Sequence, residues 1–114
     1  MHEEERDKKI SVNIVEEMKT NFADCNDISY YAKMCNLSIS RFAHLFTENY
    51  GLSPYKYLLN IRLSQAKYLL TQTNINISEI AKSVGYDDPF YFSRIFKKNF
   101  GISPNKYRQL NKRC

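Results

Sequence analysis

The sequence predicts an all-α protein of seven helices, in which two helix-turn-helix subdomains are joined by a long central helix. The first observation behind this prediction is an internal repeat: residues 28–57 and residues 77–107 carry the same residue types, at a shift of 49 and then of 50 positions. The second is that the three glycines and three prolines stand at expected helix ends, which favours helices over a sheet. Hydrophobic residues make up 43% of the chain, so we expect disorder only near its ends.

The repeat extends over apolar, small and polar positions. The pairs at a shift of 49 are Ile28 with Ile77, Ser29 with Ser78, Ala32 with Ala81 and Lys33 with Lys82. The pairs at a shift of 50 are Phe42 with Phe92, Phe46 with Phe96, Asn49 with Asn99, Gly51 with Gly101, Ser53 with Ser103, Pro54 with Pro104, Lys56 with Lys106 and Tyr57 with Tyr107. One inserted residue near Asp87 accounts for the change of shift, so the chain contains two copies of one helical unit.

The first helix is predicted over residues 10–22, where apolar residues recur at intervals of four and form an amphipathic face. These residues are Ile10, Ile14, Met18 and Phe22. A short second helix is expected from a cap at Asp27 to about Cys35. Asn36 then stands where the second copy has Gly85, and both residue types tolerate the left-handed backbone conformation that a tight turn between helices requires.

The third and fourth helices are delimited by residues that are typical of helix ends. Ser38 caps a third helix, which Gly51 ends. Ser53 and Pro54 open a fourth helix, and no helix-breaking residue interrupts it before about Gln72. We therefore expect this fourth helix to connect the two copies.

The second copy repeats these signals. Asn76 with Glu79 forms a capping box for the fifth helix. The later boundaries are Asp88–Pro89 at the start of the sixth helix, Gly101 at its end and Ser103–Pro104 at the start of the seventh. These boundaries divide the chain into a charged N-terminal extension or linker at 1–9, a first helix-turn-helix subdomain at 10–52, a connecting helix at 53–72 and a second subdomain at 73–114.

The net charge of +5 is distributed unevenly along the chain. Residues 1–28 hold eight acidic and four basic side chains, which give −4, whereas residues 29–114 hold four acidic and thirteen basic side chains, which give +9. A positive field of this kind attracts polyanions through steering and counterion release. The charge of the repeats favours binding to a polyanion, and the alternative is that the Lys and Arg side chains only solvate the surface.

Several other classes of protein find no support in the sequence. The cysteines are Cys25, Cys35 and Cys114, far apart and without a CxxC pair, which favours a reduced cytoplasmic protein over a disulfide scaffold or a metal site. No apolar run approaches the ~20 residues of a membrane span. Cys35 and His44 could suggest catalysis by a thiol and a histidine. Cys35 matches Val84 of the second copy, however, and is expected to fill the core. We expect no enzyme activity and no cofactor.

Each copy has a short helix, a tight turn and a second helix, and in a helix-turn-helix the second helix enters the major groove of DNA. At 100° per residue, one face of each second helix is mostly core: Phe42, Leu45, Phe46 and Asn49 in the first copy, and Phe92, Ile95 and Phe96 in the second. The opposite faces supply the candidates for reading bases: Ser40, Arg41, Ala43, His44, Thr47, Phe90, Ser93 and Arg94. The candidates for phosphate contact are Ser38, Lys97 and Lys98.

The length of the connecting helix suits two readers on one duplex. A helix of roughly 18 residues is about 27 Å long, and consecutive major-groove faces of DNA lie about 34 Å apart. With the width of the packed units added, we expect both second helices to enter successive major grooves.

The connecting helix and the second copy contain a series of short motifs at fixed spacing from one another. They are ISEIA at 77–81, VGY at 84–86, DP at 88–89, YFSR at 91–94, FKK at 96–98, GISP at 101–104 and YR at 107–108, with Arg62, Ala66, Leu69 and Leu70 before them. Over residues 8–110 the chain resembles the DNA-binding domain of the AraC/XylS family of bacterial transcription regulators.

The resemblance implies two helix-turn-helix units that bind double-stranded promoter DNA in the cytoplasm, at the nucleoid. Members of the family usually activate transcription by contacting RNA polymerase. The domain often sits at the end of a longer regulator whose other part senses a ligand or receives a phosphoryl signal, and a minority stand alone. A regulatory or dimerisation domain outside this chain is therefore among the expected partners, whereas a membrane is not.

The chain departs from the family pattern at four positions. Asn36 replaces the usual turn glycine, and His44 and Thr47 stand where Arg and Lys are frequent, so the first reader is expected to be less cationic. Phe90 stands where a small polar residue is common. It either points outward, where it can meet the methyl group of a thymine, or packs on a neighbouring helix.

Two other hypotheses are compatible with the sequence. A helical adaptor that docks another protein is the main alternative to a DNA-binding protein. A redox sensor that uses Cys25 or Cys114 is the second. Arg62, inside the connecting helix, is expected to form either a structural salt bridge or a DNA contact.

Overall fold

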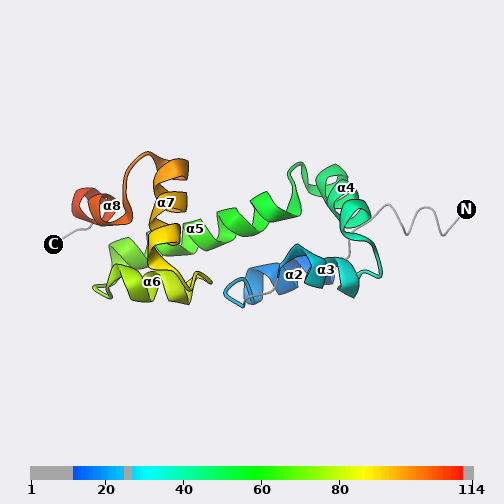
Figure 1. Cartoon of the computed structure of the whole chain (residues 1–114), viewed down its shortest axis with the longest axis horizontal. Helices are drawn as coiled ribbons and strands as arrows, with labels where there is room; N and C mark the ends of the chain where they lie inside the picture. The colour runs from blue at the N-terminus through cyan, green and yellow to red at the C-terminus, as the bar shows by residue number, and fades with distance from the viewer. Residues whose placement is uncertain (1–11, 25–26, 112–114) are drawn as a thin grey trace, which may run out of the picture. The chain divides into compact units, whose positions relative to one another are not determined.

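The computed structural model describes residues 12–24 and 27–111, so Ile10, Cys25 and Cys114 lie outside the described residues. The described residues form seven α-helices and no strand (Figure 1). In chain order they are α2 (Val12–Thr20), α3 (Ile28–Met34), α4 (Ile39–Tyr50), α5 (Pro54–Gln72), α6 (Ile77–Ser83), α7 (Pro89–Phe100) and α8 (Pro104–Asn111). The prediction of an all-α fold with seven helices is confirmed.

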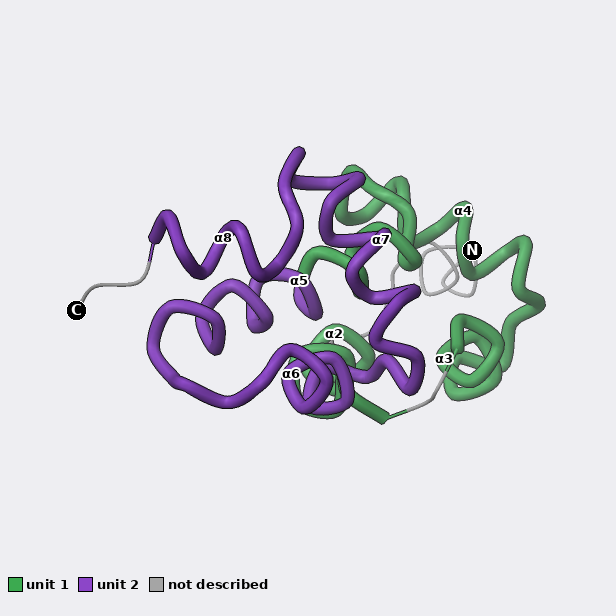
Figure 2. Tube along the Cα trace, turned by 60° about the vertical axis from the view of Figure 1, so that its left-hand side comes forward, with its two compact units in different colours: residues 1–60 green, residues 61–114 purple. Residues whose placement is uncertain are grey.

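The chain consists of two compact units, residues 1–60 and residues 61–114, and the division falls inside α5 (Figure 2). The first unit contains α2, α3, α4 and the beginning of α5. The second contains the rest of α5 with α6, α7 and α8. Each unit thus includes one of the two predicted helix-turn-helix motifs.

The core of the first unit combines one face of α2 with the inner faces of α3, α4 and α5. Its buried side chains are Ile14, Val15, Met18, Tyr31, Ala32, Phe42, Leu45, Phe46, Leu58 and Leu59. The ring of Phe46 lies 5.8 Å from that of Phe42, 4.8 Å from that of Tyr50 and 5.3 Å from that of Tyr57, measured between centroids. These tilted and edge-on contacts are favourable arrangements of aromatic rings, and they fix the inner face of α4.

The second unit repeats this core. Its buried side chains are Leu63, Ala66, Leu70, Ile80, Ala81, Val84, Phe92 and Phe96. The ring of Phe96 lies 5.9 Å from that of Phe92, 4.7 Å from that of Phe100 and 5.6 Å from that of Tyr107. Matched residues therefore make matched contacts, and both units hold their second helix in the same way.

The first helix ends earlier than predicted. Phe22 was expected inside it, but α2 ends at Thr20, and Phe22 lies half-buried in the turn that follows. Polar side chains bond within this helix end: the Thr20 hydroxyl donates to the carbonyl of Glu16 at 2.7 Å, and the Asn21 side-chain amide donates to the Glu17 carboxylate at 2.9 Å. Side chains of this kind favour helix ends over helix interiors.

The predicted N-caps accept backbone hydrogen bonds. The acceptor–donor pairs are Ser38 with Arg41 N–H at 3.2 Å, Ser53 with Lys56 N–H at 3.1 Å, Asn76 with Glu79 N–H at 2.8 Å, Asp88 with Phe90 N–H at 2.9 Å and Ser103 with Lys106 N–H at 3.1 Å. Each bond satisfies a backbone donor of the first turn that has no partner within the helix. The starts of the helices are therefore fixed by local sequence.

Asp27 caps α3 with its carboxylate. The Ser29 hydroxyl donates to this group at 2.6 Å and the Tyr30 backbone N–H at 3.3 Å. These two hydrogen bonds, that of Ser29 first, lower the pKa of Asp27 from its ordinary value of 3.8. A lowered pKa means that the ionised cap stabilises the fold above the ordinary pKa, and that this contribution is lost as the pH falls through the lowered value.

The turn between the two helices of each motif has the predicted left-handed residue. Asn36 has φ 59° and Gly85 has φ 105°. In both motifs the chain then folds back onto a buried alanine, with Leu37 N–H donating to the Ala32 carbonyl at 3.0 Å and Tyr86 N–H donating to the Ala81 carbonyl at 2.8 Å. This hydrogen bond across the turn satisfies a carbonyl at the end of the first helix and sets where the second helix begins.

Candidate nucleic-acid interface

The second helices of the two motifs, α4 and α7, each have one buried and one exposed face. Phe42 and Phe46 of α4 are 0% exposed, and so are Phe92 and Phe96 of α7. Ile95 is half-buried, and Asn49 is exposed and bonds along its own helix, donating to the Leu45 carbonyl at 2.8 Å. The buried stripe therefore matches the prediction at its aromatic positions but excludes Asn49.

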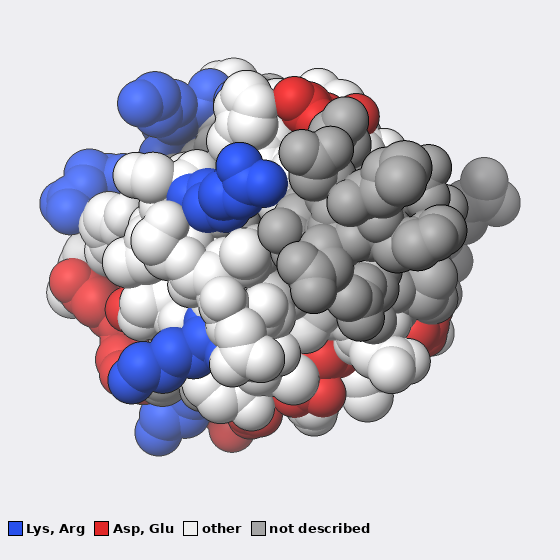
Figure 3. Space-filling model, turned by 90° about the vertical axis from the view of Figure 1, so that its right-hand side faces the viewer, with Lys and Arg blue, Asp and Glu red and all other residues white. Residues whose placement is uncertain are grey.

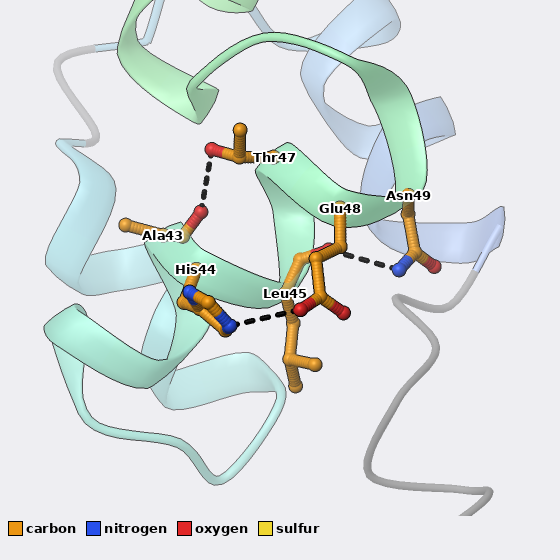
Figure 4. A network of polar contacts seen from close by, with 6 residues as sticks. All are labelled: Ala43, His44, Leu45, Thr47, Glu48 and Asn49. Carbon is orange, nitrogen blue, oxygen red and sulfur yellow. Dashed lines mark hydrogen bonds and ion pairs between the residues drawn. The ribbon is translucent and has the colours of Figure 1, made fainter.

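The first motif places most of its predicted DNA-reading residues on the surface. Ser38, Ser40, Arg41, His44 and Thr47 are exposed, and Ala43 is half-buried. The Thr47 hydroxyl donates to the Ala43 carbonyl at 2.8 Å (Figure 4). A hydroxyl bonded in this way can still accept a hydrogen bond from a ligand.

His44 has an acidic partner that the sequence analysis missed. Its Nε2 atom lies 2.8 Å from Oε2 of Glu48, one turn along α4 (Figure 4). Both side chains face solvent, 68% and 54% exposed. The spacing of four residues on a helix is the signal that predicts such a pair. The carboxylate places a negative charge on the same surface as the candidate DNA contacts.

The second motif also exposes its candidate residues. Phe90, Arg94, Lys97 and Lys98 are exposed, and Ser93 is half-buried. The side chain of Phe90 is 76% exposed. Of the two alternatives for this residue, the outward orientation is therefore correct, and packing against a neighbouring helix is not.

The two exposed faces differ in charge. Within α4, Arg41 and Glu48 oppose each other, and His44 contributes a positive charge only when it is protonated. Within α7, Arg94, Lys97 and Lys98 are all basic, and no acidic residue accompanies them. Figure 3 shows one face of the molecule, on which both basic and acidic side chains are present. The difference in charge between the two second helices follows from their residues.

The described residues provide no group of three or more His, Cys, Asp or Glu side chains that could hold a metal ion. Cys35 is half-buried, and this burial raises the pKa of its thiol. A raised pKa reduces the thiolate fraction, so the residue is a poor nucleophile near neutral pH. No helix in the described part of the chain is both long and apolar enough to cross a membrane.

Two helix-turn-helix motifs with exposed second helices are the arrangement of a DNA-binding domain. A family model described as a helix-turn-helix domain matches residues 31–110. The chain belongs to this family and contains a DNA-binding domain of the AraC/XylS type.

The curated relatives include two regulators of sugar operons. The arabinose operon regulatory protein of Escherichia coli strain K12 is 44% identical over 89 residues, which cover 77% of the chain and 30% of that protein. The lactose operon transcription activator of Staphylococcus xylosus is 40% identical over 94 residues, which cover 82% of the chain and 34% of that protein. The chain thus spans about a third of the length of these relatives.

Solved structures show the same fold. The C-terminal domain of AraT, a response regulator from Geobacillus stearothermophilus, has a TM-score of 0.85 and 32% identity, with 90% of this chain and 85% of that chain covered. The DNA-binding domain of AdpA, solved in complex with a target DNA, has a TM-score of 0.81 at 24% identity, with 86% and 88% covered.

Proposed function

We propose that the chain binds promoter DNA sequence-specifically, with α4 and α7 in successive major grooves of one duplex, and that it activates transcription. The observation that carries the proposal is the exposed face of α7, where three basic side chains and Phe90 project from a helix that its buried aromatic residues hold in place. A rigid helix with exposed basic side chains suits both phosphate contact and the reading of base edges.

The side chains divide into two roles in this proposal. Base edges are read by Ser40, Arg41, Ala43, His44 and Thr47 of α4 and by Phe90, Ser93 and Arg94 of α7. Phosphates are contacted by Ser38, Lys97 and Lys98. Arginine suits a guanine edge because its guanidinium can donate two parallel hydrogen bonds. The small side chains of Ala43 and Ser93 let the helix backbone come close to the groove.

The connecting helix supports a binding site of two parts. Helix α5 has 19 residues, which corresponds to about 28 Å at 1.5 Å per residue. Two half-sites about 10–10.5 base pairs apart, centre to centre, are expected when two recognition helices occupy successive grooves.

Activation and the remaining partners rest on the relatives. One of them is named a transcription activator, and activation in this family implies contact with RNA polymerase. Since the chain spans about a third of such relatives, we propose that a regulatory or dimerisation domain completes the regulator, which acts in the cytoplasm.

Selection of bound duplexes from a random library tests sequence-specific binding. The recovered duplex and a scrambled duplex of the same composition are then titrated by fluorescence anisotropy at two salt concentrations. We expect the recovered duplex to bind at least about tenfold more tightly, with recovered sequences conserved in two half-sites. Equal binding of both duplexes contradicts specificity. No salt-dependent binding of either duplex favours the alternative of a protein-binding adaptor.

A further inference from the structure

Two tyrosine side chains lie between two arginine side chains in the second unit. Cζ of Arg62, on α5, lies 5.6 Å from the ring centroid of Tyr86. The rings of Tyr86 and Tyr91 are 6.0 Å apart, and Cζ of Arg94 lies 5.9 Å from the centroid of Tyr91. These distances are within the range of cation–π and aromatic contacts. A continuous row of four side chains thus ends at Arg94, one of the candidates for base reading.

We propose that Tyr91 is a positioning residue that holds the guanidinium of Arg94 in place for a base edge, and that Tyr86 supports the Tyr91 ring. The inference rests on the proposed role of Arg94 in reading DNA. In this proposal Tyr91 does not itself read a base but increases the discrimination between base pairs by Arg94.

The geometry of the Tyr91–Arg94 pair explains how positioning works. The two residues are three apart on α7, so their side chains lie on neighbouring parts of one helix surface. Tyr91 is 42% exposed, which places its ring beside the guanidinium at the surface and not inside the core. A guanidinium that contacts an aromatic face keeps its N–H groups free to donate in the plane. The arginine then loses less conformational freedom when it binds a base.

Tyr86 connects this pair to the rigid part of the unit. Its backbone N–H donates to the carbonyl of the buried Ala81 at 2.8 Å. Its ring lies 5.7 Å from that of Phe92, which is 0% exposed. Arg62, on α5, lies against the Tyr86 ring and so belongs to the same row. This contact does not decide between the salt bridge and the DNA contact that the sequence predicts for Arg62. The support behind Tyr91 therefore belongs to the core.

The first unit has no counterpart of this row at the matched positions. Arg41 stands at the position of Tyr91, His44 at that of Arg94, and Leu37 at that of Tyr86. His44 contacts the carboxylate of Glu48 instead of an aromatic ring. Positioning through a tyrosine is therefore expected only for the second reader, and the first reader serves as an internal reference.

The test uses the full 114-residue chain with four variants: Tyr91→Leu, Tyr91→Phe, Arg94→Ala and Tyr91→Leu combined with Arg94→Ala. The probe is the duplex recovered by selection, together with duplexes in which each base pair is replaced in turn. Arg94→Ala identifies the base pair that Arg94 reads, because replacement of that pair no longer matters in this variant. Circular dichroism checks that each variant retains the helical fold.

We expect Tyr91→Leu to reduce discrimination at this base pair by about two- to fivefold, the change that corresponds to an exposed cation–π contact. The salt slope should stay unchanged because no charge is removed. Tyr91→Phe should restore discrimination because it keeps the ring. In the Arg94→Ala background, Tyr91→Leu should have no further effect.

Four outcomes overturn the proposal. Equal losses in Tyr91→Leu and Tyr91→Phe mean that the tyrosine hydroxyl contacts DNA directly. A loss from Tyr91→Leu that persists without Arg94 means that the ring acts on its own or through the fold. If Tyr91→Leu discriminates normally and Arg94→Ala loses discrimination, only the positioning role of Tyr91 is wrong. If Arg94→Ala also discriminates normally, the proposed reading role of Arg94 is wrong as well.

Discussion

The two recognition helices, α4 and α7, share their buried faces and differ on their exposed ones. Inside, Phe42 and Phe46 correspond to Phe92 and Phe96, all 0% exposed. Outside, the matched pairs are Ser40 with Phe90, Arg41 with Tyr91, His44 with Arg94, Thr47 with Lys97 and Glu48 with Lys98. Packing in a core constrains volume and shape, whereas exposed positions vary at little cost in stability. The repeat therefore keeps one scaffold and presents two different surfaces.

The difference between these surfaces is mainly electrostatic. With His44 neutral, the charges of α4 cancel, since Arg41 is opposed by Glu48. Helix α7 carries three positive charges. Since each phosphate contact by a basic side chain adds to the salt-dependent part of DNA affinity, α7 is expected to supply most of that part. The first motif contributes shape and hydrogen bonding more than charge.

The largest effect should show that the two cores are equivalent. Phe46→Ala and Phe96→Ala each remove a buried ring that contacts three others. Each should lower the free energy of unfolding by about 3–5 kcal/mol, measured by denaturant unfolding followed by circular dichroism. The exposed Ser64→Ala, in α5, is the control and should change it by less than about 0.5 kcal/mol. A small effect at one phenylalanine alone would show that the cores differ.

The next effect separates the two readers at a matched position. Arg94→Ala should weaken binding to the selected duplex by about 1–3 kcal/mol if the guanidinium contacts a base. His44→Ala should cost less than about 1 kcal/mol near neutral pH, because an imidazole cannot make the two parallel hydrogen bonds that a guanidinium makes to a base edge. Fluorescence anisotropy measures both. The opposite order of losses would make α4 the dominant reader.

Reciprocal substitutions that exchange charge between α4 and α7 should change the salt dependence of DNA binding. Lys97→Gln with Lys98→Gln should reduce the slope of log affinity against log salt by up to about 2, since each phosphate contact contributes about 0.9. Thr47→Lys with Glu48→Lys gives α4 the residues that α7 has, and should steepen the slope. Titrations between about 50 and 200 mM salt measure it. Slopes that do not respond would identify the lysines as solvated surface charges.

The smallest effect concerns protonation of α4. If the His44 imidazole contacts phosphate as a cation, binding takes up a proton, and affinity should rise as the pH falls. The Glu48 carboxylate, whose Oε2 lies 2.8 Å from Nε2 of His44, would be neutralised by the same proton. The control is His44→Ala, which keeps the other histidine, His2. Parallel pH profiles of the two proteins would exclude a cationic phosphate contact by His44.

Local features of this protein were predictable because they depend on neighbouring residues. Caps at Ser38 and Asn76 and the left-handed turn at Asn36 follow from side-chain and backbone chemistry within a few positions. The end of the first helix was wrong by two residues, since Phe22 fits the apolar spacing but the side chains around Thr20 and Asn21 bond to the last turn instead.

The candidate site was predictable as a set of positions but not as a set of interactions. Helical periodicity placed Arg94 and Phe90 outside, and the structure decided between the two alternatives for Phe90. The partner of His44 was missed although the i,i+4 spacing of Glu48 indicates it. Two of the residues in the row that ends at Arg94, Arg62 and Tyr86, come from segments other than α7, which periodicity treats separately.

The amino-acid sequence alone determined the helices of the described residues, their caps, the buried aromatic positions of α4 and α7 and the duplication, because these depend on spacing and on the chemistry of single residues. Only the tertiary structure decided how separate segments meet: Arg62 of α5 with Tyr86 of the turn after α6, and Tyr86 with Tyr91 of α7. The contact of Tyr91 with Arg94 lies within α7 and has the i,i+3 spacing that helical periodicity indicates. The other two contacts arise from the packing of different segments, which periodicity within one helix does not encode.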